Sequence, residues 1–232
     1  MRPLDGDYLS QFLSLFSQYD VPAAFWVNIK LTFFAAIIAL VIGTVLAVMR
    51  ISPLPSLRWA GTTYVNVFRN TPLTIIIVFC VLGLWSQLGV VLSSDFNENF
   101  FRLAVLGLAV YHAAFVCEAL RSGVNTVPIG QAEAARAIGL GFLPTARLII
   151  LPQAFRGAVA PLGNTLIALA KNSTVAAAGS VAEAAGLMKT MIEFRSDVIF
   201  AIFFTFALGF VVIVIPIGLA TTSLSRRLAV TR

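Results

Sequence analysis

Charged and amide side chains interrupt otherwise apolar stretches of this chain. Glu118 and Arg121 stand three residues apart, a spacing that places both on one face of a helix, close enough to pair. Lys171-Asn172-Ser173-Thr174 breaks a second apolar stretch, and Arg69-Asn70-Thr71-Pro72 precedes a third. Such groups could bind a charged solute by ion pairing and hydrogen bonding, or they could fasten helices to one another.

No group of residues has the spacing of a catalytic centre. The single histidine, His112, lies in an apolar run, and we expect it to be a hydrogen-bonded core residue. Because it is the only histidine, a Ser-His-Asp set is excluded. Cys80 and Cys117 also lie in apolar runs and lack metal-ligand spacing. The sequence has no glycine-rich loop with a lysine that could bind the phosphates of a nucleotide. We therefore expect a protein that is not an enzyme and that binds no metal or cofactor itself.

The composition places these polar groups in a membrane. The chain is 59% apolar and only 11% charged, with a mean hydropathy of +0.94, whereas soluble domains are about 25% charged. Ionisable groups at membrane depth are costly unless they face protein or water, and a polar break in a span is tolerated only when buried in protein or lining a cavity. We predict a substrate path lined by Glu118, Arg121, Asn164, Lys171, Asn172, Ser173, Arg69 and Thr71.

Structural roles remain the alternative for these residues. The Glu118–Arg121 pair could simply lock a helix end to the loop that follows it, and we favour this role for the pair. The turn at Arg69 could hold a helix terminus by its backbone, which we also favour over substrate contact. For the polar break at Lys171, we favour a role in substrate binding and a purely structural role equally.

Five stretches are apolar and long enough to cross a bilayer, which requires about 20 residues. We predict an all-α transmembrane protein with one transmembrane domain over residues 25–225. Its expected spans are residues 27–49, 73–92, 101–120, 158–178 and 198–219. The first 22 residues lack the basic start and compact apolar run of a signal peptide, and we expect an amphipathic or disordered segment there.

The distribution of Lys and Arg orients these spans, because cytoplasmic loops are enriched in both. One side of the predicted membrane carries ten basic residues and one acidic residue, in segments 50–69, 121–156 and 225–232. The other side carries four basic and eight acidic residues, in segments 1–24, 93–102 and 181–197. We therefore predict a multi-pass plasma-membrane protein with segment 1–24 extracellular and the basic tail 226–232 cytoplasmic. The basic tail is then expected to lie beside anionic lipid, so the net charge of +6 does not indicate that the protein binds nucleic acid.

A polar loop over residues 131–152 separates two very apolar segments. Gln131–Ile138 is rich in strong helix formers, and Gly139 and Gly141 predict a hinge. A second short helix is expected around Pro144, ending at Pro152. The loop is suited to press on a partner in water, although a helix pair lying on the membrane without a partner would have a similar composition.

At this loop the sequence resembles the EAA loop of permease subunits of ABC importers. Glu133-Ala134-Ala135, Gly139, Ile149 and Leu151-Pro152 match that pattern at all seven positions and at its fixed spacing. The resemblance extends over residues 22–228, to the polar amino acid subfamily, and is strongest to glutamate-uptake permeases of actinobacteria. Further matching positions are Arg69, Thr71-Pro72-Leu73, Glu118, Arg121, Gly130-Gln131, Gln153, Arg156, Pro161, Asn164, Lys171-Asn172-Ser173 and Glu183.

The resemblance implies a five-helix type I permease that imports a polar amino acid, glutamate above all. It also implies three partners: a second permease subunit, expected to be a different chain, a dimeric cytoplasmic ATPase that binds ATP and Mg, and an extracellular amino acid binding protein. ATP-driven closure of the ATPase would switch the permease between inward-facing and outward-facing states. The loop residues expected to couple it to the ATPase are Glu133, Ala134, Ala135, Arg136, Gly139, Leu140, Gly141 and Phe142.

Within that loop, Leu140 and Phe142 are expected to enter an apolar groove of the ATPase, with Glu133 and Arg136 at its polar rim.

Two other functions remain open. The chain could be a secondary transporter or channel acting alone, although we find no convincing inverted repeat, or it could be a permease partner that binds no substrate.

Overall fold

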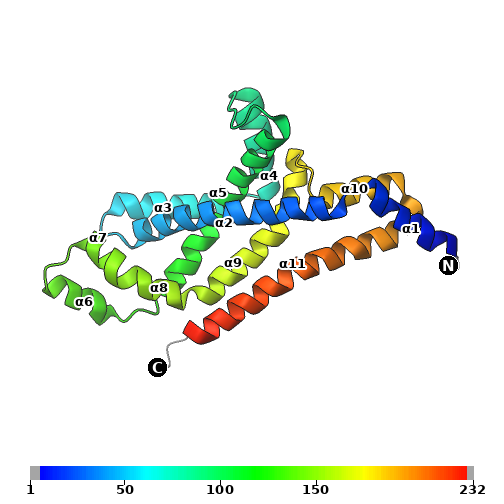
Figure 1. Cartoon of the computed structure of the whole chain (residues 1–232). Coiled ribbons are helices and arrows are strands. Elements are labelled where there is room, and N and C mark those ends of the chain that lie inside the picture. Colours follow the sequence, from blue (N-terminus) through cyan, green and yellow to red (C-terminus); the bar gives the residue numbers. More distant parts are fainter. Residues whose placement is uncertain (1–5, 229–232) are drawn as a thin grey trace.

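The computed structural model describes residues 6–228, and every regular element in that range is helical (Figure 1). The all-α prediction is therefore confirmed. Three segments are long and apolar enough to cross a membrane. They are α2 (Val21–Ile51), α5 (Phe96–Val124), and the run of η4 (Ser196–Val198) into α11 (Ile199–Leu228).

Two bent helix pairs could raise the number of crossings to five. The first joins α3 (Pro55–Arg69) to α4 (Leu73–Val78) and η1 (Phe79–Gln87), with a bend of 102°. The second joins Val159–Gly179 to α10 (Ala184–Phe194), with a bend of 58°. Five spans are thus compatible with the helices but remain a prediction.

The second predicted span ends earlier than the apolar stretch does. Helix stops at Gln87 instead of residue 92, since Gly89 has a φ of +66° and turns the chain. The remaining apolar residues form an irregular connection to α5, where Leu92 N donates to Asn99 Oδ1 at 2.7 Å. Trp85 packs edge-on against Phe100, which holds η1 against the first turns of α5.

The pair α2–α5 forms the centre of the molecule and makes its most extensive helix contact. Leu31 and Ala35 of α2 are buried in one apolar cluster with Leu103 and Leu108 of α5. The helices approach closely at Gly43, where a Cβ would lie 2.5 Å from Val116 Cγ1. Small residues at such contacts let membrane helices pack by van der Waals interactions.

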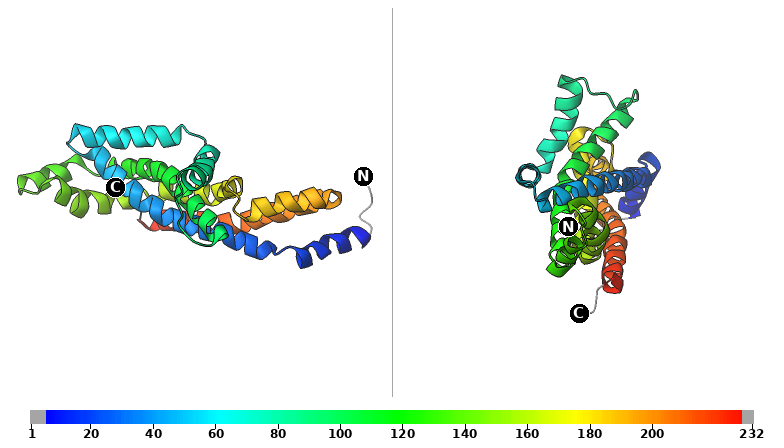
Figure 2. Two further views of the ribbon diagram at one scale, coloured as in Figure 1. Left: turned by 90° about the horizontal axis from the view of Figure 1, so that it is seen from above. Right: turned by 90° about the vertical axis from the view of Figure 1, so that its left-hand side faces the viewer.

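The molecule is elongated, with different elements at its two ends (Figures 1 and 2). One end carries α6 (Ile129–Ala137) and α7 (Phe142–Thr145). The other end carries α1 (Gly6–Gln18) and α10, whose apolar residues share a cluster with α2 and α11. The N-terminal segment is therefore helical over Gly6–Gln18, and its Leu15 is fully buried in that cluster.

The last long helix, α11, packs along α9 (Val159–Asn172) and leaves most of its surface uncovered. Only 17% of its most apolar window is buried, against 72% for α5. Large exposed side chains such as Phe204, Leu208 and Val212 follow its outer face. That face requires lipid or another membrane subunit as its surroundings.

Candidate functional site

The loop at one end of the molecule reverses direction at Gly139. Helix α6 ends at Ala137, and Gly139 N donates to Arg136 O at 3.0 Å while Leu140 N donates to Ala135 O at 3.0 Å. This is the hydrogen-bond pattern of a helix ending on a left-handed residue. Gly139 has a φ of +86°, a conformation that strains residues with a Cβ. Gly141 is extended, so Gly139 alone provides the left-handed turn of this loop.

The second part of the loop contradicts the prediction that a helix ends at Pro152. Helix continues from α7 through η2 (Ala146–Ile150) into α8 (Leu151–Gly157), with Pro152 inside it. Proline normally clashes with the carbonyl one turn earlier. Here the preceding turn is a wider π-helix, and Gln153 Nε2 donates to Ile149 O at 2.9 Å, which provides a partner for a carbonyl near the proline.

This helix is fastened tightly to α5. A Cβ on Gly123 would lie 2.1 Å from Ala154 O, so the backbones of α5 and α8 are in direct contact. Thr126 Oγ1, just beyond α5, donates to Gly123 O at 2.7 Å and also closely approaches Gly157. The loop and the end of α5 are therefore joined by direct backbone contact.

The predicted coupling residues do not all face outward. Ala135 is buried and Leu140 is half-buried, while Glu133, Ala134, Arg136, Gly139, Gly141 and Phe142 are exposed. Leu140 and Phe142 line a cleft of about 610 Å³ between the loop and the turn after α2, together with Arg58 and Arg136. The most exposed apolar side chains of the region are Ile129, Ile138, Leu143 and Leu148.

Those four residues were missed by the sequence analysis. Their signal was present, because bulky apolar residues flank the glycine turn of an otherwise polar loop. A cluster of exposed apolar side chains marks a surface that binds another protein or a membrane. The loop thus has a larger apolar contact surface than Leu140 and Phe142 alone would provide.

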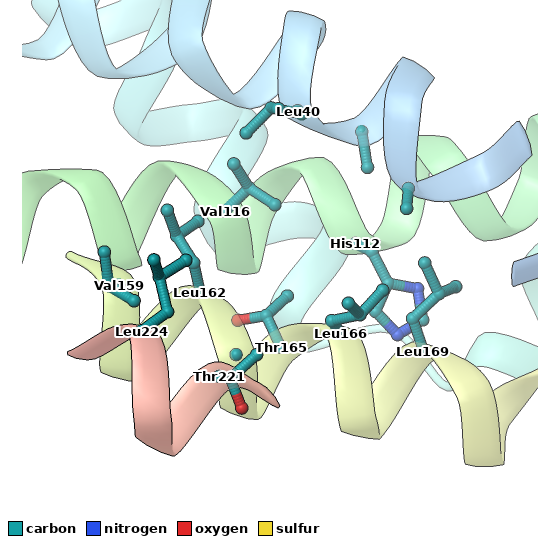
Figure 3. Close-up of a pocket in the computed structure, with 13 residues that line it drawn as sticks. Leu40, His112, Val116, Val159, Leu162, Thr165, Leu166, Leu169, Thr221 and Leu224 are labelled. Carbon is teal, nitrogen blue, oxygen red and sulfur yellow. The ribbon is translucent and has the colours of Figure 1, made fainter. Parts of the chain in front are cut away.

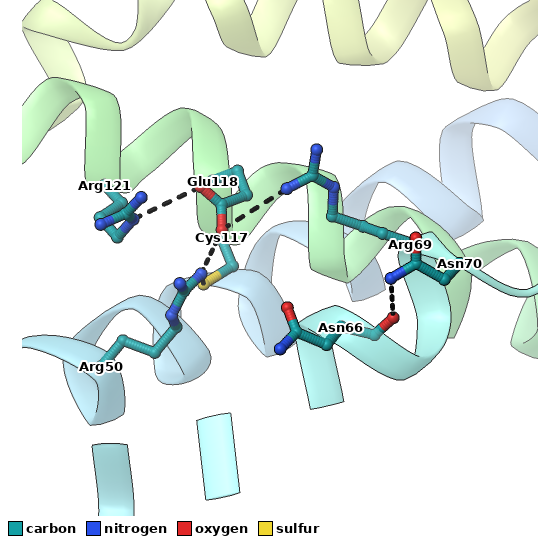
Figure 4. A network of polar contacts seen from close by, with 7 residues as sticks. All are labelled: Arg50, Asn66, Arg69, Asn70, Cys117, Glu118 and Arg121. Atoms are coloured by element: carbon teal, nitrogen blue, oxygen red, sulfur yellow. Dashed lines mark hydrogen bonds and ion pairs between the residues drawn. The ribbon is translucent and has the colours of Figure 1, made fainter. Parts of the chain in front are cut away.

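Glu118 lies at the centre of a cluster of three arginines (Figure 4). Arg121 Nε is 3.4 Å from its Oε2, as the predicted pair requires, and Arg69 Nη1 is 3.7 Å from its Oε1. Arg50, at the end of α2, donates to the same Oε1. The cluster joins α2, α3 and α5, and three positive charges against one negative charge leave an excess of two.

Arg50 was not among the predicted site residues. It is 68 positions from Glu118 in the sequence, so no helical spacing connects them. Its side chain is only 12% exposed, whereas those of Arg69 and Arg121 are 47% and 46% exposed. Arg50 is thus the structural member of the cluster, and the other two guanidiniums face open space in which an anionic group could bind.

A second cavity forms where α5 faces α9, and we call it the polar cavity after its histidine and asparagine side chains. A cavity of about 320 Å³ is lined by His112, Phe115, Asn164 and Asn172 among others. Asn172 Nδ2 lies 3.2 Å from His112 Nε2, and His112 Nδ1 lies 2.9 Å from Leu108 O. The carbonyl requires a proton on Nδ1, and the amide of Asn172 is oriented to donate to Nε2. His112 is buried and hydrogen-bonded, as expected for a core residue.

An apolar cavity of about 260 Å³ also borders His112 (Figure 3). Its walls come from α2, α5, α9 and α11 and include Leu40, Val116, Leu166 and Leu224. His112 and Thr165 line both cavities. The polar cavity is also close to the arginine cluster, since Arg69 Cζ lies 5.8 Å from the centre of the Phe115 ring.

The predicted substrate-path residues therefore fall into separate groups. Glu118, Arg121 and Arg69 meet in the arginine cluster, and Asn164 and Asn172 meet in the polar cavity. Lys171 is exposed beside Asn172. Thr71 Oγ1 donates to Val67 O at 2.8 Å at the end of α3, and Ser173 is fully buried. Contact of any of these residues with a substrate stays a prediction.

Comparison with known proteins gives one family match and several close relatives. Residues 39–230 match the family model described as binding-protein-dependent transport system inner membrane component. The chain is 54% identical over 212 residues to the glutamate transport system permease protein GluC of Corynebacterium glutamicum, covering 89% of this chain and 93% of GluC. It is 33% identical to the glutamate transport system permease protein GluD of the same organism, covering 74% and 62% of the two chains.

A solved structure has the same fold. It is described as the crystal structure of an amino acid ABC transporter with histidines, and it superposes with a TM-score of 0.77 at 26% identity. The match covers 93% of this chain and 98% of the other. The arrangement of bent helices in Figure 1 is thus similar to that of a solved transporter chain.

Proposed function

The chain belongs to the family of binding-protein-dependent transport system inner membrane components, and we propose that it is the permease subunit of an ATP-driven importer for glutamate. The observation that carries this proposal is the 54% identity to GluC over 89% of the chain. The chain is a transport component and has no catalytic activity of its own, as its family membership indicates.

The arginine cluster supports an anionic substrate. Glutamate carries two carboxylates and one ammonium group, and carboxylates bind guanidinium groups by charge-assisted hydrogen bonds. Arg69 and Arg121 are half-exposed, while Glu118 neutralises only one of the three positive charges around it. In this proposal the polar cavity at Asn172 binds the remaining polar groups of the amino acid.

The loop supports coupling to a separate ATPase that binds ATP and Mg. Ile138, Phe142 and Leu143 are exposed apolar residues beside the charged Glu133 and Arg136, a combination that fits an apolar groove with a polar rim. The close contact of α8 with α5 would carry movement of this loop to the Glu118 cluster. Alternating access would then follow from rigid-body motion of the loop and α5.

The proposed assembly contains a second permease of different sequence and an extracellular binding protein. Corynebacterium glutamicum has two glutamate transport system permease proteins, GluC and GluD, and this chain is similar to both. The uncovered face of α11 offers an apolar surface to such a partner.

The test is ATP-driven uptake in proteoliposomes that contain this chain with its partner permease, ATPase and binding protein. We expect concentrative uptake of labelled glutamate, with competition by unlabelled glutamate and loss on removal of the ATPase. Uptake by the isolated chain under an ion gradient would establish a secondary transporter instead. Uptake of a different amino acid, without competition by glutamate, would overturn the substrate assignment.

A further inference from the structure

A polar network in the interior joins three helical elements that are distant in sequence. Asn28 lies in α2, Ser173 begins η3 (Ser173–Gly179), and Glu183 caps α10. Their exposed fractions are 2%, 0% and 0%. Asn28 Nδ2 donates to both Ser173 Oγ and Glu183 Oε2 at 2.8 Å, and Asn28 Oδ1 accepts from Ala184 N at 2.9 Å.

The Glu183 carboxylate in this network is held by hydrogen bonds alone. Besides Asn28, it accepts from Ala185 N at 2.9 Å and from Gly186 N at 2.8 Å. Within residues 6–228, no lysine or arginine forms an ion pair with it. Burying a carboxylate without a cation is costly, so a network of this kind requires a more specific explanation than general stability.

The network contacts the chain on both sides of η3, which follows the polar break of α9. Ser173 Oγ accepts from Asn28 and donates to Ala170 O at 2.8 Å, in the last turn of α9. The neighbouring Asn172 is the residue whose amide reaches His112 in the polar cavity. At the other end of η3, Ser180 has a φ of 60° and turns the chain towards Glu183. Both ends of the break are thus fastened to the same side chain of α2.

We propose that Asn28, Ser173 and Glu183 are positioning residues that hold Asn172 at the polar cavity and thereby set the affinity for the transported amino acid. This rests on the proposed function, because the cavity must lie on the substrate path. None of the three residues needs to touch the substrate. Their effect is transmitted through the backbone between residues 170 and 173.

The decisive substitution is Glu183→Gln, which keeps the size of the side chain. It places a buried amide donor against groups that are themselves donors, so at least one hydrogen bond of the network is lost. In the complete transporter we expect the KM for glutamate uptake to rise about tenfold, the effect of one such bond. Maximal uptake and basal ATP hydrolysis should change less than twofold.

A double variant that exchanges the amide and the carboxylate between positions 28 and 183 should partly restore the affinity. Combining Asn28→Asp with Glu183→Gln puts the carboxylate on α2 and the amide on α10. The carboxylate can still accept from Ala184 N, and it can now accept from the new amide. It can also accept from Ser173 Oγ, which would donate to it in place of Ala170 O, so the contact between α2 and the break is kept. We expect the KM to return at least half of the way, on a logarithmic scale, to the wild-type value. The control is Asp95→Asn, since Asp95 Oδ1 caps α5 by accepting from Glu98 N and, within residues 6–228, forms no hydrogen bond with Asn28, Ser173 or Glu183.

A second measurement reports the position of residue 172 without any substrate. Asn172→Cys is labelled with a maleimide, alone and combined with Glu183→Gln, with Cys80 and Cys117 replaced by alanine. A labelling rate that changes several-fold supports the proposal, and an unchanged rate overturns it. Reduced maximal uptake or complex yield with an unchanged KM would also overturn it, because the network would then be merely structural. If the wild-type transporter imports no glutamate, the proposed function fails, and the labelling experiment still decides the positioning role.

Discussion

Gly139 is the residue at which the loop depends most directly on backbone conformation. Alanine at this position meets no atom within 4 Å, so its only penalty is the φ of +86°. That penalty is roughly 1–2 kcal/mol, which would weaken binding of the ATPase to the purified permease by about 5- to 30-fold. Gly139→Ala is therefore expected to raise the Kd for the ATPase, measured with the permease in nanodiscs.

Gly141→Ala is the matched control for this measurement. Its added Cβ also meets no atom within 4 Å, and its φ of −69° is open to any residue. We expect its Kd to equal that of the wild type. Equal Kd values for both variants and the wild type would contradict a role for the left-handed turn in docking.

Arg50 and Arg121 make unequal contributions to the cluster around Glu118. The Arg50 side chain is 12% exposed, and the Arg121 side chain is 46% exposed. Exposed ion pairs contribute at most about 1 kcal/mol, and a pair that is more shielded from water interacts more strongly because the effective dielectric constant around it is lower. Arg50→Gln should therefore lower the unfolding temperature in detergent, followed by tryptophan fluorescence, by clearly more than Arg121→Gln. Equal losses would show that burial does not distinguish the two pairs.

Residue spacing could predict only the local part of this cluster. The Glu118–Arg121 pair follows from a separation of three positions in one helix. Arg50 and Asn28 could not be assigned, because their partners belong to other helices and their contacts depend on how α2 crosses α5 and meets α10. The same limit applies to Ser173, which the pattern placed on a substrate path and the structure places in a buried network.

At the scale of the elements, the loop that follows α5 presents its apolar side chains to its surroundings. Leu143 in α7 is 65% exposed, and Leu88 after η1 is 68% exposed. A charge at either position should leave the fold intact. Leu143→Glu is expected to reduce co-purification of the ATPase severalfold in a pull-down from detergent, because an apolar docking surface does not tolerate an unpaired charge.

The Leu88→Glu variant provides the comparison for that pull-down. It changes the same residue type at nearly the same exposure, in the connection that precedes α5. Co-purification at the wild-type level is expected for it. Equal losses in the two variants would indicate a general effect on the protein instead of a docking surface.

The sequence predicted the elements well where apolar runs or caps determine them, and less well where packing decides. Residues 27–49 lie in α2, residues 101–120 in α5, and residues 198–219 in the run of η4 into α11. That these helices cross the membrane at those residues stays a prediction. The continuation of helix through Pro152 could not be predicted, because it depends on a local π-helix and on the Gln153 side chain. The bends between α3 and α4 and between η3 and α10 likewise depend on tertiary contacts.

For the whole molecule, the number of spans decides on which side of the membrane each surface lies. With segment 1–24 extracellular, as predicted, five crossings place the loop at 129–157 in the cytoplasm and the connection at 88–95 on the outside. If only α2, α5 and α11 cross, these two segments exchange sides, although the termini stay where they are. The charge distribution favours five crossings, because residues 121–156 contain four arginines and one acidic residue.

Cysteine labelling distinguishes the two arrangements. Gln131 and Asn97 are exposed, and Cys80 and Cys117 are buried. With five spans, Asn97→Cys should react with a membrane-impermeant maleimide in spheroplasts, in which the plasma membrane is intact. Gln131→Cys should react only after that membrane is permeabilised. The reverse pattern would contradict the predicted topology and would place the loop where no cytoplasmic ATPase could bind it. Since α5 is the one long helix between these positions, a single experiment thus tests the orientation on which coupling depends.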